Sequence, residues 1–123
     1  MKPEARLIRQ GDLFWAQIEK EKDQATGIFH PHLVIQDDLF NLSRIETVIV
    51  CALTTRLQCA TEPGNVLLQD GEGNLPKQSV IVVSQLSSVP KSSLGDYIGS
   101  LSSERVAQVL AGIRFQQAAF FRT

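Results

Sequence analysis

The stretch "TVIVCALTT", residues 47–55, decides the fold class. It is almost entirely apolar and rich in β-branched side chains, which favour extended backbone. Its length suits a strand and is short for a helix. A continuous apolar run, without polar alternation, is typical of a strand that is covered on both faces. We therefore predict that residues 47–55 form the central strand of a β-sheet.

Other apolar segments on either side of this strand predict the rest of the sheet. The run "SVIVVSQLSSV", residues 79–89, predicts a second long buried strand. Three shorter segments predict further strands: "GDLFWAQI" (11–18), "HLVIQ" (32–36) and "NVLLQ" (65–69). The segments between them predict a mobile charged loop (19–27), a turn or single helical turn (37–46) and a glycine-marked turn (70–74).

The last part of the chain changes to a helical period. Ser102 or Ser103 can cap a helix, and Glu104 then lies in its first turn, where the helix dipole favours an acid. The apolar residues that follow recur at helical spacing: Val106, Val109, Leu110 and Ile113. The sequence therefore predicts a mainly β (α+β) fold, a small curled barrel with a C-terminal amphipathic helix packed on the sheet.

Size and composition are those of an ordinary globular domain. The 123 residues, 43% hydrophobic and 20% charged, predict one domain spanning residues 1–123. A net charge of -1 argues against tight non-specific binding to nucleic acid, although a local basic groove is compatible with it. No apolar run is long enough to cross a membrane, and residues 1–12 lack the apolar core of a signal peptide, so we expect a cytoplasmic protein.

Both histidines of the chain flank one proline in "HPHLVIQDD", residues 30–38. His30 and His32 alternate around Pro31, so on a strand both side chains face the same way. A metal site needs more ligands, and no spacing brings in the nearest acids, Asp37 and Asp38. Proton transfer and a strand end without chemistry both fit these histidines. The two cysteines, Cys51 and Cys59, match no zinc spacing and are expected to be reduced thiols, so we expect no metal or other cofactor.

The order of these motifs resembles the MazF/PemK family of toxins from type II toxin–antitoxin systems. The resemblance covers roughly residues 9 to 115 and rests on "GDLFW", "HPHLVIQDD", "TVIVCALTT", "SVIVVSQLSSV" and "LGDYIGSLSSERVAQVL" in that order. It implies an SH3-like barrel that forms a homodimer and cuts single-stranded RNA without a metal, with the RNA 2'-hydroxyl as nucleophile. It also implies a partner antitoxin, whose disordered tail occupies the same groove.

The resemblance carries over to individual residues with some departures. The family's Arg-Pro at the start of the second strand is His30-Pro31 in this chain, and its threonine at the end of the central strand is matched by Thr54. Where many members carry an acid, a glutamine, an apolar residue and a base, this chain has the sequence of residues 84–87, "SQLS", which lacks both charges. The glycine-and-acid element of the first loop has no counterpart. Either His30 has taken over the arginine's role, or the catalytic apparatus has decayed.

These matches define the candidate site. His30 is the candidate acid/base group, Thr54 would hold a phosphate oxygen, and arginines 44 and 56 would neutralise developing phosphate charge. The further candidate RNA contacts are Thr55, Gln36, Lys77, Gln85 and Trp15. Arg44 precedes the central strand, whereas Arg56 follows it directly.

Two other expectations concern partners. An apolar strand face, or the helix with Phe115, Phe120 and Phe121, would supply the seam of the homodimer. The alternative function is that of a non-catalytic toxin or binding module on the same fold, acting on a protein target such as DNA gyrase. Fold alone does not separate the two functions, because function depends on the site.

Overall fold

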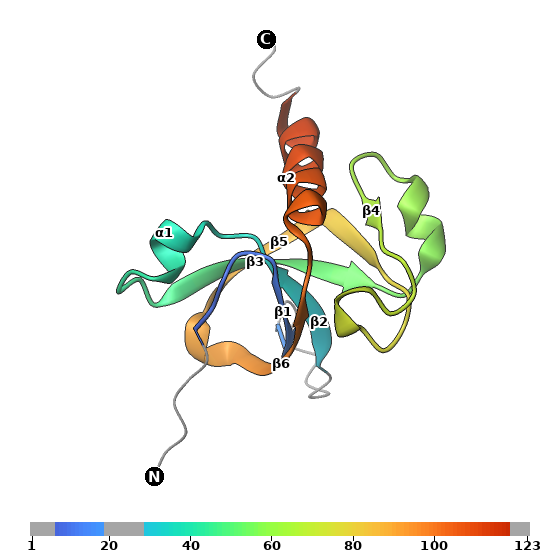
Figure 1. Cartoon of the computed structure of the whole chain (residues 1–123). Helices are drawn as coiled ribbons and strands as arrows, with labels where there is room; N and C mark the ends of the chain where they lie inside the picture. Colours follow the sequence, from blue (N-terminus) through green and yellow to red (C-terminus); the bar gives the residue numbers. More distant parts are fainter. Residues whose placement is uncertain (1–6, 19–28, 119–123) are drawn as a thin grey trace.

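Six strands form one antiparallel sheet in the computed structural model, which describes residues 7–18 and 29–118 (Figure 1). The order across the sheet is β4-β5-β3-β2-β1-β6. The strands are β1 (Asp12–Ala16), β2 (His30–Val34), β3 (Thr47–Thr54), β4 (Val66–Leu67), β5 (Val80–Pro90) and β6 (Leu94–Ser100). The helices are α1 (Asp38–Asn41) and α2 (Ser103–Ala118), with 3-10 segments η1 (Leu57–Thr61), η2 (Glu72–Asn74) and η3 (Lys91–Ser93).

The sheet is open, although the mainly β class is confirmed. Its outer strands, β4 and β6, do not pair with each other in the part of the chain that the structure describes. β4 is only two residues long, so it offers too few backbone groups to continue the ladder towards β6. Instead α2 packs on β5 and β4, and η2 packs on β6. The predicted small curled barrel is therefore a curled sheet that does not close between β4 and β6 in the described residues.

β3 is a central strand, as predicted, but its covering is uneven. Its partners are β2 on one side and β5 on the other. Val48, Val50 and Cys51 are fully buried, whereas the side chain of Ile49 is 39% exposed. β5 is likewise buried over residues 80–83 and at Val89, and the rest of its second half is exposed or partly exposed. The prediction that both strands are buried throughout is thus correct for about half of each, because the helices cover only part of the sheet.

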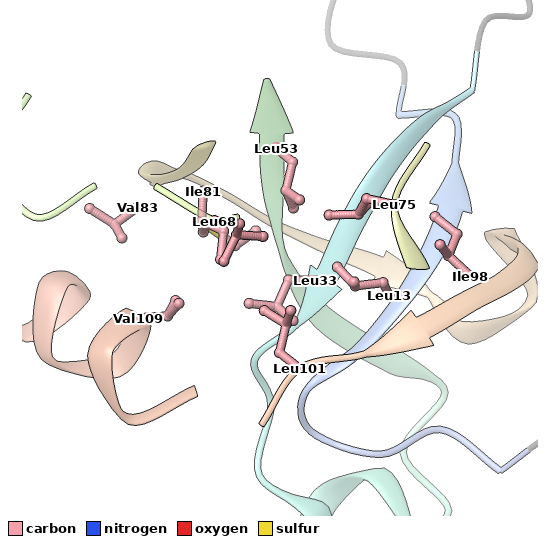
Figure 2. Close-up of a cluster of buried hydrophobic side chains, with 11 residues drawn as sticks. Leu13, Leu33, Leu53, Leu68, Leu75, Ile81, Val83, Ile98, Leu101 and Val109 are labelled. Atoms are coloured by element: carbon pink, nitrogen blue, oxygen red, sulfur yellow. The ribbon is translucent and has the colours of Figure 1, made fainter. Parts of the chain in front are cut away.

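Apolar side chains on the two faces of the sheet form two separate cores. Leu13, Leu33 and Cys51 are paired across β1, β2 and β3 and belong to the larger cluster, which also includes Val109 of α2. Figure 2 shows the side chains of this cluster, with Val109 pointing from the helix towards the strands. The next residue along each strand faces the opposite way, as the pleat requires. The second cluster consists of Phe14, Val34, Val48, Val50 and Val89.

The predicted C-terminal helix is confirmed. Ser102 accepts a hydrogen bond at its Oγ from the backbone N–H of Arg105, 3.2 Å away, and so caps the helix. Of the predicted apolar stripe, Val109 is fully buried and the other three residues are partly buried. Gly112 is also buried, because the helix approaches the backbone at Gly64 closely. The helix is therefore held against both β5 and the turn before β4.

Several smaller expectations also have an outcome. The helical turn predicted within residues 37–46 is α1, and the two cysteines form no disulfide. β6 was not predicted, because Gly95, Asp96 and Gly99 are typical of turns. The loop predicted at 19–27 and the side chains of Phe120 and Phe121 lie outside the described residues. Over residues 7–18 and 29–118, no helix has the length and apolar character needed to cross a membrane.

Candidate active site

The candidate site lies where β2 begins and β3 ends. The two strands are antiparallel, with His32 opposite Ala52. Continuing this register by two residues brings His30 level with Thr54, and both then lie on the same face of the sheet. Residues that are 24 positions apart in the sequence are therefore expected at the same end of the two strands, and they are the two candidates for catalysis.

An open depression of about 770 Å³ surrounds this pair. Its walls come from the start of β2, the end of β3 with the turn that follows, η1 and its continuation, and β5. Five of the predicted site residues line it: His30, Thr54, Thr55, Arg56 and Gln85. The other lining residues are Gln17, Ile18, Pro31, His32, Ala52, Leu53, Cys59, Glu62, Ser79, Val82 and Ser84.

The two histidines occupy different environments within the depression. His30 is exposed, so its imidazole can reach a molecule bound from solvent. His32 is only 6% exposed, and its Nδ1 lies 2.8 Å from the backbone oxygen of His30. A protonated Nδ1 donates a hydrogen bond to that oxygen. His32 thus supports the backbone that carries His30, whereas His30 is free to meet a substrate.

The end of β3 combines hydroxyl groups with a cation. The Oγ1 of Thr54 accepts a hydrogen bond from the backbone N–H of Arg56, 3.2 Å away. This bond leaves the hydroxyl hydrogen of Thr54 available to donate to another group. Thr55 and Arg56 are both exposed at the rim. The arrangement suits an anion, since a hydroxyl donor and a guanidinium lie at the same strand end.

Four of the predicted site residues lie outside this depression. Gln36 donates from its Nε2 to Asn41 and to the backbone oxygen of Thr47, near α1. Arg44 is exposed before β3, and therefore at the opposite end of that strand from Thr54. Trp15 is partly buried against the larger core, and Lys77 is exposed before β5. Sequence spacing did not separate these residues from those that line the depression.

Sequence reasoning also missed lining residues that carry chemistry. Glu62 and Cys59 come from η1 and the turn after it, in a segment with no motif. Among the described residues that line the depression, Glu62 is the one carboxylate and Arg56 the one guanidinium. Nothing in "CATEPGN", residues 59–65, singles out this glutamate, because only the path of the turn brings it to the site. Within the described ranges, no three histidine, cysteine or acidic side chains gather as a metal site would require.

Comparison with known proteins relates this chain to one family. A family model described as "PemK-like, MazF-like toxin of type II toxin-antitoxin system" matches residues 9–116. Endoribonuclease MazF2 of Mycobacterium bovis is 32% identical over 108 residues, which are 88% of this chain and 95% of the relative. Endoribonuclease MazF of Staphylococcus saprophyticus is 30% identical over 103 residues, 84% of this chain and 85% of the relative.

Solved structures agree on the fold. An endoribonuclease in complex with its cognate antitoxin, from a mycobacterial species, superposes with a TM-score of 0.72. It is 16% identical, and the match covers 90% of this chain and 95% of that one. MazF in a MazE–MazF crystal structure from Deinococcus radiodurans has a TM-score of 0.70 at 18% identity, covering 91% of this chain and 96% of that one. At this level of identity the likeness concerns the fold.

Proposed function

Because the chain belongs to the PemK-like, MazF-like toxins of type II toxin–antitoxin systems, we propose that it is an endoribonuclease that cleaves single-stranded RNA. The observation that carries the proposal is that His30, Thr54 and Arg56 line one depression at the end of β3. A scissile phosphate needs a proton-transfer group, a hydrogen-bond donor and a cation around it. These three side chains supply one of each.

The proposed reaction uses the ribose 2'-hydroxyl of the RNA as nucleophile and needs no metal. The hydroxyl oxygen attacks the neighbouring phosphorus while the bond to the 5'-oxygen breaks. His30 exchanges a proton with one of these oxygens, Thr54 donates a hydrogen bond to a phosphate oxygen, and Arg56 neutralises the charge that develops. The products are a 2',3'-cyclic phosphate and a 5'-hydroxyl. Thr55 and Gln85 would contact the RNA beside the scissile bond.

The proposed protein partners are a second copy of this chain and a cognate antitoxin in the cytoplasm. A structural relative was solved with its antitoxin, which supports such a partner for this chain. An antitoxin tail that folds on binding can cover a long groove with a short peptide. We propose that it occupies the depression around His30 and so competes with RNA.

The test is cleavage of defined single-stranded RNAs by the purified protein in excess EDTA, with the product ends identified. We expect cleavage that leaves 2',3'-cyclic phosphate ends. Arg56→Ala should lower kcat, because it removes the cation at the site, and Arg44→Ala is the matched control at the far end of β3. Equal loss in both variants would show a general charge effect. An inactive wild type would favour the non-catalytic alternative with a protein target.

A further inference from the structure

Cleavage through the 2'-hydroxyl requires two proton transfers. A base takes the proton from the 2'-oxygen, and an acid gives one to the leaving 5'-oxygen. His30 supplies one of these groups under the proposed function, on which this inference rests. Ser84 lines the depression as an exposed hydroxyl and carries no carboxylate. The second proton-transfer group must therefore come from elsewhere in the wall.

Glu62 lies in that wall and is the one carboxylate among the lining residues that the structure describes. It directly follows η1, where its backbone N–H donates to the oxygen of Cys59 at 3.1 Å. Its side chain is exposed, and Oε1 accepts a hydrogen bond from Nδ2 of Asn65 at 3.2 Å. Oε2 forms no hydrogen bond with the residues that the structure describes, so it is available to a bound molecule.

Asn65 fixes this wall to the sheet. Its Nδ2 also donates to the backbone oxygen of Cys59 at 3.0 Å, and its Oδ1 accepts from the backbone N–H of Val83 in β5 at 3.0 Å. One side chain thus ties Glu62, the end of η1 and a buried strand together. A carboxylate held in this way is better positioned for proton transfer than one on a free loop.

We propose that Glu62 is the general base of the reaction and His30 the general acid. A carboxylate is an acceptor only, whereas a protonated imidazole donates. Glu62 takes the proton of the 2'-hydroxyl as its oxygen forms the bond to phosphorus. The bond from phosphorus to the 5'-oxygen breaks, and that oxygen receives a proton from His30. Glu62 ends protonated and His30 neutral, and water returns both to their starting forms.

The other charged and titratable side chains of the depression have different roles. Arg56 carries the positive charge that balances the phosphate, His32 is buried, and Cys59 is partly buried.

A purely repulsive role for Glu62 predicts a different result for its removal than a role as general base does. If its charge merely kept RNA away, removing that charge would tighten RNA binding and leave the chemical step unchanged.

The experiment compares the wild type with Glu62→Gln. This variant keeps the shape of the side chain, but its neutral amide does not act as a base. Glu46→Gln, an exposed site before β3, is the matched control. Multiple-turnover cleavage of one RNA gives kcat and KM for each variant, and thermal unfolding reports folding. Glu62→Asp is the second variant, because it retains a carboxylate with a shorter reach.

We expect Glu62→Gln to lower kcat by roughly 10²–10⁴-fold with little change in KM, and Glu46→Gln to match wild type. Glu62→Asp should retain more activity than Glu62→Gln. If the wild type is active and Glu62→Gln keeps its kcat, the role of Glu62 is overturned and the proposed function stands. A lower KM of Glu62→Gln at an unchanged kcat leads to the same conclusion. If the wild type cuts no RNA, both the proposed function and the role of Glu62 are overturned.

Discussion

At the scale of single residues, the two histidines have different roles because one is buried and the other is exposed. They are two positions apart on β2 and face the same depression. His30 is open to solvent, whereas His32 is enclosed and contacts the backbone oxygen of His30. An enclosed imidazole contributes to the fold through packing and its hydrogen bond, and an open one can exchange protons with a substrate.

Substituting each histidine by alanine should therefore separate activity from stability. His30→Ala should lose roughly 10²–10⁴-fold in cleavage rate and stay folded, because an exposed side chain contributes little to packing. His32→Ala should lose less activity but about 1–3 kcal/mol of unfolding free energy, because it removes a buried side chain together with its hydrogen bond to the backbone. RNA cleavage and urea unfolding measure the two effects. Full activity in His30→Ala would exclude its role in proton transfer.

At the scale of elements, the position of α2 depends on two kinds of contact. Gly112 of the helix and Gly64 of the turn after η1 pack backbone to backbone, so a methyl group at Gly112 would collide with the oxygen of Gly64. Near the start of the helix, Arg105 binds Glu72 of η2 through Nε at 2.7 Å and through Nη2 at 3.0 Å. The glycine contact brings the helix to the segment that carries Glu62, so the packing of α2 bears on the wall of the site.

The Glu72–Arg105 pair should make stability depend on pH. The hydrogen bond from Arg105 holds the pKa of Glu72 below its ordinary value of 4.5, although partial burial opposes this. Because the pKa is lower in the folded protein, the pair stabilises fully above pH 4.5, and this contribution is lost as the pH falls through the folded-state pKa. We expect Glu72→Gln to cost about 1 kcal/mol at pH 7 and much less at pH 3.

Urea unfolding at the two pH values measures this difference. Glu104→Gln, an exposed acid in the first turn of α2, is the control that changes the same charge without breaking the pair. An equal loss at pH 3 and pH 7 for Glu72→Gln would show that the pair contributes through packing and not through charge.

At the scale of the whole molecule, exposed apolar side chains gather at one end. Figure 1 shows α1 and β4 at opposite ends of β3. On the α1 side, five large apolar side chains are exposed within 11 residues: Leu39, Phe40, Leu42, Ile45 and Ile49. A cluster of exposed large apolar side chains in one short segment is typical of an interface. On α2, among the described residues, Phe115 is the one large apolar side chain exposed to this degree.

The proposed homodimer should therefore form through the α1 side. Phe40→Glu places a charge within this apolar surface and should turn the dimer into a monomer at micromolar concentration, because burying an unpaired charge is unfavourable. Phe115→Glu is the matched control on the helix and should remain dimeric. Sedimentation velocity distinguishes the outcomes. A monomeric Phe115→Glu with a dimeric Phe40→Glu would place the dimer interface on α2, which is the second of the two interfaces predicted from the sequence.

The sequence alone was sufficient for features that depend on local chemistry. β-branched runs predicted β3 and β5, and helical spacing from Val106 to Ile113 predicted α2, because side-chain period and backbone preference act over a few residues. The motif order also indicated the family and, through it, the candidates His30 and Thr54, which line the same depression. β6 escaped prediction because its glycines read as turns, and its strand form depends on pairing with β1.

Only the tertiary structure decided which polar residues share a site. Arg44 and Arg56 are equivalent by composition and flank the same strand, yet that strand carries them to opposite ends of the sheet. Glu62 has no motif, and it reaches the depression because Asn65 ties its turn to β5. The open sheet and the partial exposure of β3 and β5 likewise follow from which elements cover them. Local pattern determines what each segment becomes, whereas contacts between distant segments determine which side chains meet.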